Sequence, residues 1–172
     1  MELLIPGLIL VALMVYASTR LKKYTAAAFE AESVETDEFA IEKPAGFLHV
    51  LNGDPTYAFE AYSREFGTSG AENIRRATVT IRTDAGRSIK QITADRIRKE
   101  DGKVSDTTEV VDGIKYKVIE LTRTEKGVDR RIFHKLAESN GKVYDLRIAA
   151  LSETTDELLP GIETLLSSFR IK

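Results

Sequence analysis

The chain has 172 residues, and residues 1–23 differ in composition from the rest, so we expect one domain of ordinary size with an N-terminal appendage. Charged residues make up 30% and aromatic residues 8% of the chain, which excludes wholesale disorder, and a net charge of −2 gives no overall field that would attract nucleic acid. The absence of cysteine excludes a disulfide framework, a thiolate nucleophile and a cysteine-based metal site.

The chain opens with an uncharged apolar run from Leu3 to Thr19. As a helix this run would cover about 25 Å, which is short of a hydrocarbon core about 30 Å thick. Basic side chains that follow it can snorkel to the headgroups and lengthen the span. We therefore expect residues 1–23 to form a single-pass membrane anchor. Its membrane-interface residues are the three cations that end the run: Arg20, Lys22 and Lys23.

Two other interpretations of this segment stay open. A cleavable signal peptide carries positive charge ahead of its apolar run, whereas Glu2 is the only charged side chain there, but the sequence Val15-Tyr16-Ala17 fits the small-residue rule at a cleavage site. The run would also fit a buried core helix. Because loops rich in lysine and arginine stay in the cytoplasm, an anchor would place the N-terminus outside and the folded domain in the cytoplasm.

Residues 24–38 are predicted to be an acidic stalk or linker. The stretch from Thr25 to Ser33 has high helix propensity and would continue the helix out of the membrane. The acidic residues around it suggest a solvated linker, or a segment that anionic headgroups repel so that the domain stays off the membrane surface. These residues are Glu30, Glu32, Glu35, Asp37 and Glu38.

From Phe39 onward the pattern changes to short strands and turns, with alternating segments over residues 39–43 and 47–51. The stretch from Tyr57 to Ser63 fits a helix capped by Asp54, but its alternation favours a strand. Residues 76–82 alternate most clearly and predict a half-buried strand.

A helix is predicted from Ile89 to about Lys99, because Ser88 and Gln91 have the spacing of a capping box. A meander of strands follows, joined at hairpin signals in 112–113, 125–127 and 139–141. Thr154 and Glu157 predict a second capping box, which opens a C-terminal helix. Pro160 either kinks that helix or begins its main segment.

The last hairpin allows two registers. A two-residue turn at Asn140-Gly141 would place cations on the apolar face of the final strand. We therefore expect a three-residue loop, which sets Ile132 opposite Ile148 and turns His134 toward the core. In this register a cationic and aromatic sheet face is left open as the candidate partner surface, and its residues are Arg131, Phe133, Lys135 and Arg147.

This order of elements resembles the PsbP-like superfamily over residues 39–172. The resemblance rests on the F-x-I-x-x-P-x-x-F pattern from Phe39 to Phe47, on Asn140-Gly-Lys-Val-Tyr-Asp-Leu146, and on the terminal Leu165-Leu-Ser-Ser-Phe-Arg170. It implies an α/β/α sandwich around an antiparallel sheet. It also implies a role in binding or assembly with other proteins, as for the extrinsic photosystem II subunit. None of the family's functional residues can be matched here, and there is no cysteine to lipidate as in its lipoprotein members.

No motif for catalysis or for a cofactor is present. The stretch from Gly67 to Gly70 lacks the nucleophile-elbow spacing, and no phosphate loop, dinucleotide fingerprint or metal-binding pair occurs. His49 and His134 lie in predicted strands, where packed structural histidines are common.

A group of lysines and arginines in the middle of the sequence forms a basic zone. It is interpreted as a solvated face or, alternatively, as a patch that binds anionic lipid or a partner. Its residues are Arg75, Arg76, Arg82, Arg87, Lys90, Arg96, Arg98 and Lys99.

The sequence thus predicts an α+β domain at residues 39–172, with an antiparallel sheet of about five to seven strands flanked by helices, plus the N-terminal transmembrane helix. Our leading hypothesis is a non-catalytic, membrane-tethered module that binds or assembles with a protein and uses no cofactor, metal or nucleic acid. Two alternatives remain. One is an exported, signal-cleaved domain that binds a ligand or partner, and the other is a small enzyme with an unidentified carboxylate-based site.

Overall fold

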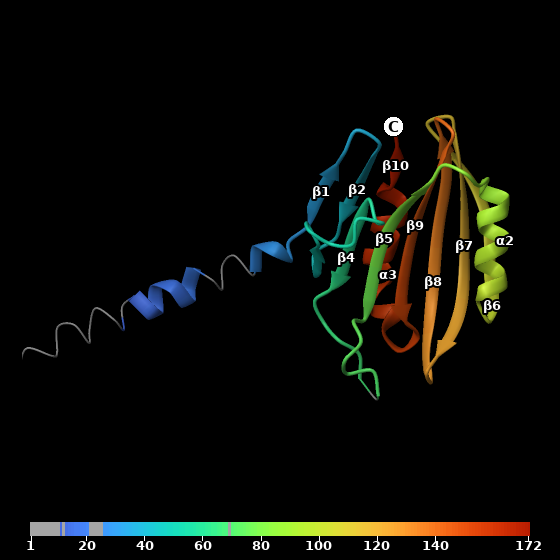
Figure 1. Ribbon diagram of the computed structural model, residues 1–172. Coiled ribbons are helices and arrows are strands. Elements are labelled where there is room, and N and C mark those ends of the chain that lie inside the picture. The colour runs from blue at the N-terminus through green and yellow to red at the C-terminus, as the bar shows by residue number, and fades with distance from the viewer. Residues whose placement is uncertain (1–10, 12, 21–25, 69) are drawn as a thin grey trace, which may run out of the picture.

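Two antiparallel sheets form the centre of the protein in the computed structural model, which describes residues 11, 13–20, 26–68 and 70–172 (Figure 1). The larger sheet has seven strands in the order β3-β4-β5-β9-β8-β7-β6. In chain order these are β3 (Phe47–His49), β4 (Phe59–Ser63), β5 (Ala77–Asp84), β6 (Gly102–Val111), β7 (Ile114–Glu125), β8 (Val128–Ser139) and β9 (Lys142–Leu151). The smaller sheet has the order β1-β2-β10 and contains β1 (Glu32–Glu35), β2 (Phe39–Lys43) and β10 (Arg170–Ile171).

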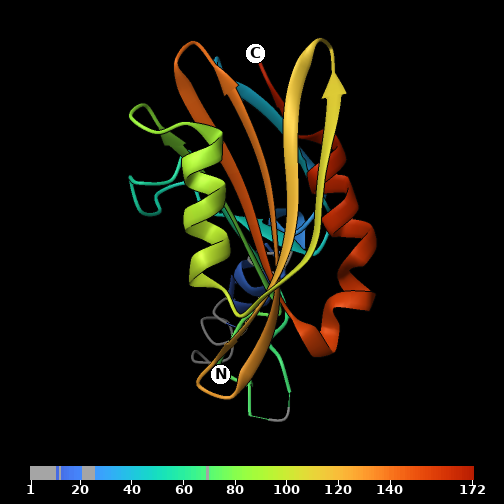
Figure 2. The ribbon, with the colours of Figure 1, turned by 90° about the vertical axis from the view of Figure 1, so that its right-hand side faces the viewer.

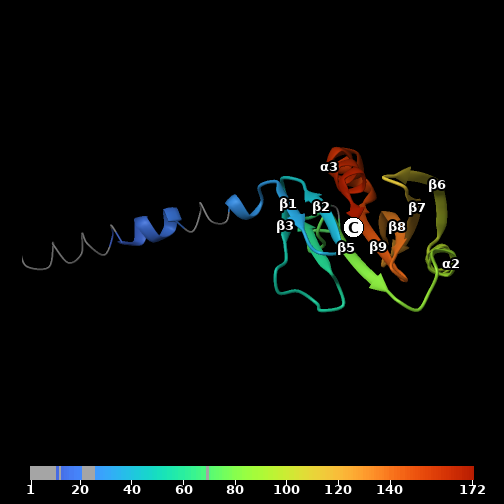
Figure 3. The ribbon, with the colours of Figure 1, turned by 90° about the horizontal axis from the view of Figure 1, so that it is seen from above.

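The helices α2 (Ile89–Lys99) and α3 (Thr155–Ser168) lie on opposite faces of the larger sheet (Figures 2 and 3). The α3 face carries the main core, in which Phe39, Phe169 and Ile148 are buried. The α2 face carries a smaller cluster around Ile92, Ile132 and Leu136. The predicted α/β/α arrangement and its antiparallel sheet are therefore confirmed, as is the preference for a strand over residues 59–63.

The turns of the meander follow the hairpin signals. Each has two residues with positive φ at its tip, and the second of these is a glycine, as a type I′ turn requires. The pairs are Asp112-Gly113, Lys126-Gly127 and Asn140-Gly141.

The register that we predicted for the last hairpin is wrong. Ser139 pairs with Lys142, so the loop has two residues, and Phe133 instead of Ile132 lies opposite Ile148. This register places Lys135 opposite Leu146, on the apolar side that we had considered unsuitable for a cation. It is tolerated because the Lys135 ammonium finds partners under α3, which are described below.

The two predicted capping boxes have different outcomes. At α2 the box is present, since Gln91 N donates to Ser88 Oγ (3.4 Å) and Ser88 N donates to Gln91 Oε1 (2.9 Å). The box at Thr154 is wrong, because residues 152–154 form a 3₁₀ turn and the Thr154 side chain bonds back to the Leu151 carbonyl. Helix α3 begins at Thr155 and continues through Pro160.

The predicted stalk is wrong over part of its length. Residues 32–35 form β1, which pairs with β2, and among the described residues of this stretch only 26–28 are helical. The buried Lys43 ties the preceding segment to the domain, because its Nζ donates to the carbonyls of Ala28 (3.4 Å), Glu30 and Phe47 (2.8 Å). Gly46 N also donates to the Phe29 carbonyl (2.7 Å). The folded unit thus starts about ten residues before the predicted boundary at Phe39.

Two truncations test this boundary. A chain without residues 1–23 keeps the contacts of Lys43 and is expected to unfold cooperatively. A chain without residues 1–38 loses β1 and two carbonyl partners of a buried ammonium, and we expect its free energy of unfolding to be lower by about 2 kcal/mol. Urea denaturation measures both. Equal stabilities would place residues 24–38 outside the folded unit.

Much of the predicted anchor lies outside the described residues. In the part of the chain that the structure describes, no helix is both long and apolar enough to cross a membrane. Residues 13–20 are helical and lie apart from the sheets in Figure 1. The large apolar side chains of this stretch are 60–64% exposed, namely Leu13, Met14, Val15 and Tyr16.

Candidate functional site

A groove of about 790 Å³ lies between α2 and the outer hairpin of β6 and β7. Its floor is apolar because α2 buries only Ile92 against the sheet and leaves Ile89 and Ile97 half-buried beside it. Ile114, at the start of β7, lies at the edge of the groove, but its side chain packs against the main core on the α3 face. Two partly exposed isoleucines in one concave surface are typical of a binding site.

The rim of the groove is mostly positive. Lys90 on α2 and Lys115 on β7 line it and make no ion pair with any described residue. Lys117 also lines it but pairs with Asp106 of β6, and Glu138 is the one lining carboxylate. The groove therefore combines an apolar floor with two unpaired cations on opposite walls.

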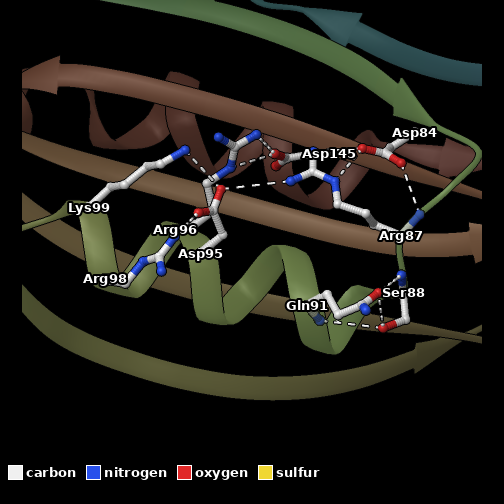
Figure 4. Close-up of polar contacts among 9 residues, drawn as sticks. All are labelled: Asp84, Arg87, Ser88, Gln91, Asp95, Arg96, Arg98, Lys99 and Asp145. Atoms are coloured by element: carbon white, nitrogen blue, oxygen red, sulfur yellow. Dashed lines mark hydrogen bonds and ion pairs between the residues drawn. The ribbon is translucent and has the colours of Figure 1, made fainter.

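Local sequence fixes both walls. The capping box at Ser88 and Gln91 sets where α2 begins, and Figure 4 shows its two hydrogen bonds. The turn at Asp112-Gly113, with φ of 54° and 81°, sets where β7 begins. Since Lys115 and Lys117 are two positions apart in a strand, they lie on the same face of the sheet, which is the face toward α2.

The four residues of the predicted partner surface do not share an exposed face. Phe133 (6% exposed) and Lys135 (0%) lie beneath α3 in the main core. Arg131 is on the same face and is held by Glu120 at 2.6 Å. Arg147 pairs with His134 across the strands, so it lies on the opposite face. The prediction of one open face is wrong because it rested on the wrong hairpin register.

Lys135 is accommodated in the core by three contacts. Its Nζ donates to the Leu166 carbonyl at the end of α3 (2.6 Å), lies 2.7 Å from Glu109 Oε1, and sits 4.4 Å from the centre of the Tyr116 ring. Burial lowers the pKa of this ammonium, and Glu109 offsets part of that effect. The side chain thus has a structural role and is not available to a partner.

Among the predicted membrane-interface residues, Arg20 is described, with its guanidinium 5.8 Å from the centre of the Tyr16 ring. Lys22 and Lys23 lie outside the described residues. The structure therefore gives no test of their position.

The two histidines lie on opposite faces of the sheet. His49 pairs with Ala61 of β4 on the α3 side and lies 3.4 Å from Glu32. His134 is buried on the α2 side, where its Nδ1 is 2.6 Å from Asp145 Oδ1. Within the described ranges, no group of three or more histidine, aspartate or glutamate side chains is arranged to hold a metal ion.

Three carboxylates converge beside α2, but each is paired with a cation (Figure 4). Asp84 lies 2.6 Å from Arg87, Asp95 lies 2.9 Å from Lys99, and Asp145 lies 2.8 Å from Arg96. Hydrogen bonds and these cations lower the pKa of Asp84 and Asp95. Burial alone would raise the pKa of Asp145, but His134 and Arg96 lower it overall. None of the three is therefore poised as a general acid near neutral pH.

The predicted basic zone is largely neutralised by the same pairing. Arg87, Arg96, Arg98 and Lys99 contact the three carboxylates named above, and Arg76 pairs with Glu65 (2.8 Å) and Glu157 (3.0 Å). Arg75 donates to the Arg64 carbonyl (2.6 Å) and lies over the Phe66 ring. Most of the zone is a solvated, paired surface. Its main exceptions are Lys90 at the groove and Arg82, which donates to the Tyr57 hydroxyl and makes no ion pair with any described residue.

Comparison with solved structures places the chain in a known fold. The solution structure of PsbP (CyanoP) from Synechocystis sp. PCC 6803 matches with a TM-score of 0.55 at 13% identity, covering 83% of this chain and 92% of that one. LpqN from Mycobacterium tuberculosis, involved in cell envelope biogenesis, matches with a TM-score of 0.60 at 12% identity, covering 83% and 91%. No protein-family model matches the sequence, and no curated protein is significantly similar to it.

The chain is therefore an α+β sandwich with the PsbP-like fold, and the resemblance noted from the sequence is confirmed at the level of fold. At 12–13% identity the likeness concerns architecture alone. The function of this chain has to be argued from its own groove and charges.

Proposed function

We propose that this chain is a non-catalytic, membrane-tethered binding module whose groove beside α2 holds an acidic, apolar segment of a protein partner. The groove itself is the observation that carries the proposal. Its half-buried Ile89 and Ile97 offer apolar contact, and the unpaired Lys90 and Lys115 select for carboxylates at the edges of the bound segment.

The shape of the groove suits a short helix. The α2 wall has 11 residues, which is about 16 Å at 1.5 Å per residue, or three turns of a partner helix laid beside it. An amphipathic helix would place apolar side chains spaced by three and four residues on the isoleucines and its carboxylates next to the lysines. The groove leaves its isoleucines partly open to solvent, whereas a bound acyl chain would be expected to lie in an enclosed cavity.

Two observations favour binding over catalysis. The carboxylates that converge beside α2 are held ionised by cations, and the two histidines lie on opposite faces of the sheet. Neither PsbP (CyanoP) nor LpqN is described as an enzyme. The alternative enzyme hypothesis requires two carboxylates that are free to act as an acid and base pair. No such pair is found among the described residues.

Tethering belongs to the same proposal. The apolar run of residues 3–19 followed by Arg20, Lys22 and Lys23 supports an uncleaved anchor with the domain on the cytoplasmic side. Confinement to a membrane would raise the effective concentration of the groove near a partner in the same membrane, so that modest affinity would suffice. An exported domain remains the alternative.

Site-specific photo-crosslinking of the full chain in intact cells tests the proposal. A photoreactive residue at Ala94, in the groove, is expected to capture one protein, whereas one at Lys126, on the distant β7–β8 turn, is not. Capture at Ala94 should be abolished by Lys90→Glu combined with Lys115→Glu, because reversing both charges repels an acidic segment. Both lysines are exposed, so the variant should keep its thermal unfolding midpoint.

The control outcomes are specific. Capture that is equal at Lys126, or that survives the charge reversal, would contradict the groove as the docking site.

The intact mass of the same protein extracted from membranes tests the tether. Retention of residues 1–17 supports the anchor, and their loss would favour export.

A further inference from the structure

A second hollow lies on the same side of the larger sheet and shares no residue with the groove. It has a volume of about 200 Å³ and is lined by Tyr57, Thr80, Arg82, Arg96, Asp145 and Arg147. We call it the arginine pocket. Three guanidinium groups meet one carboxylate there, which leaves a surplus of two positive charges.

Arg147 is the central feature of the arginine pocket. It projects from β9 between Thr80 of β5 and His134 of β8, and it is partly buried. Its guanidinium makes no hydrogen bond or ion pair with any described residue, although Asp145 and Glu100 are near enough to affect it electrostatically. Burial lowers the pKa of Arg147, yet an arginine stays charged at neutral pH. A partly buried cation without a bonded partner is costly unless an anion completes it.

Asp145 does not complete it, because its oxygens bond to Arg96 and His134, and no hydrogen bond or ion pair joins it to Arg147. Oδ2 accepts from Arg96 Nε (3.1 Å) and Nη2 (2.8 Å), as Figure 4 shows. Oδ1 lies 2.6 Å from His134 Nδ1. This arrangement also fixes the Arg96 guanidinium at the wall of the pocket while leaving its Nη1 without a bond to any described residue.

Arg82 and two hydroxyl groups form the other side of the arginine pocket. Arg82 Nη2 donates to the Tyr57 hydroxyl (2.9 Å), and its guanidinium stacks 4.5 Å from the centre of that ring. The Tyr57 proton remains free to be donated, as does that of the Thr80 hydroxyl. The adjoining hollow adds Arg87 and Lys99, but Asp84 and Asp95 balance them, so the surplus of positive charge stays in the arginine pocket.

We propose that the arginine pocket binds a phosphate-class oxyanion, either inorganic phosphate or the phosphomonoester end of a larger molecule. Planar guanidinium groups bind phosphate oxygens through paired, charge-assisted hydrogen bonds, and a tetrahedral anion has enough acceptors for three of them together with two hydroxyls. The volume suits the phosphate group alone, since sites for whole drug-sized ligands span about 300 to 1,000 Å³. The inference is independent of what occupies the groove.

Calorimetric titration of the full chain in detergent with inorganic phosphate, against chloride at equal ionic strength, tests the proposal. We expect saturable binding with one site per chain. Arg147→Gln should weaken it by roughly tenfold or more, because the charge-assisted bonds of one guanidinium are lost. The matched control is Arg98→Gln, on the same helix as Arg96 but outside the pocket, which should change the affinity by less than about twofold.

Further variants and probes keep the test decisive. Arg82 is exposed, so Arg82→Gln should fold even if Arg147→Gln does not, and it too should weaken phosphate binding. Dihexanoyl phosphatidic acid that binds roughly tenfold tighter than inorganic phosphate would identify a lipid headgroup as the source, and equal binding would identify free phosphate. An absence of saturable binding, or an equal loss in Arg98→Gln and Arg147→Gln, would overturn the proposal.

Discussion

Replacing Phe169 with alanine is expected to lower the free energy of unfolding by about 3 to 5 kcal/mol, the range for removing a fully buried aromatic side chain. Phe169 is 0% exposed and follows the last turn of α3. Its ring centre lies 6.3 Å from that of Phe39 in the smaller sheet and 6.4 Å from that of Tyr116 in the larger sheet. The cavity left by the substitution would therefore open where α3 and both sheets meet.

The same substitution at an exposed phenylalanine provides the control. Phe66 is 42% exposed and contacts Arg75, so Phe66→Ala should lower the free energy of unfolding by about 1 kcal/mol or less. Urea denaturation followed by circular dichroism measures both variants. A loss below about 0.5 kcal/mol for Phe169→Ala would show that α3 does not close the core as described.

Several features that depend on near neighbours in the chain were predictable from the sequence. The capping box at Ser88 and Gln91 and the turn at Asp112-Gly113 are set by residues within a few positions of one another. The alternation over residues 76–82 likewise reflects one strand with one buried face.

Features that depend on distant partners were not. The hairpin register seemed to bury a cation without compensation. However, Lys135 contacts Glu109 and the Leu166 carbonyl, which lie 26 and 31 residues away from it in the chain. Residues 32–35 were interpreted as part of a solvated linker because of their acidic side chains. They form β1 because their backbone pairs with β2 and Val34 is partly buried, and composition reveals neither of these.

The groove was missed for a related reason. The spacing of Ile89 and Ile97 predicted an amphipathic helix, but only the topology shows that α2 covers the sheet incompletely and that Lys115 of β7 faces it. One pattern in the sequence could have indicated the groove. Lys115 and Lys117 are two positions apart in a strand, so they form a cationic face, which the structure places next to the apolar helix α2. Arg147 was predicted on an open face of the sheet, but it is partly buried, and its neighbours Thr80 and Asp145 come from strand pairing and from the pocket that the fold creates.

The second large effect is expected at Asp145. Asp145→Asn keeps the shape of the side chain but removes the charge that holds Arg96 and the buried His134, and breaking a buried charge pair by removing one partner lowers the free energy of unfolding by about 3 to 5 kcal/mol. The control is Asp37→Asn, at an exposed aspartate in the turn between β1 and β2, which should change the free energy of unfolding by less than about 0.5 kcal/mol.

The pH dependence separates lost charge from lost packing at Asp145. Because the folded protein holds the pKa of this carboxyl below its ordinary value, the stabilisation is fully present above the unfolded pKa of about 4 and is lost as the pH falls through the folded pKa. The difference in stability between the natural chain and Asp145→Asn should therefore be constant from about pH 5 to 7 and shrink below about pH 4. Urea denaturation at each pH measures it. A difference that stays the same at about pH 3 would assign the effect to packing, because a charge pair cannot stabilise the fold once its carboxylate is protonated.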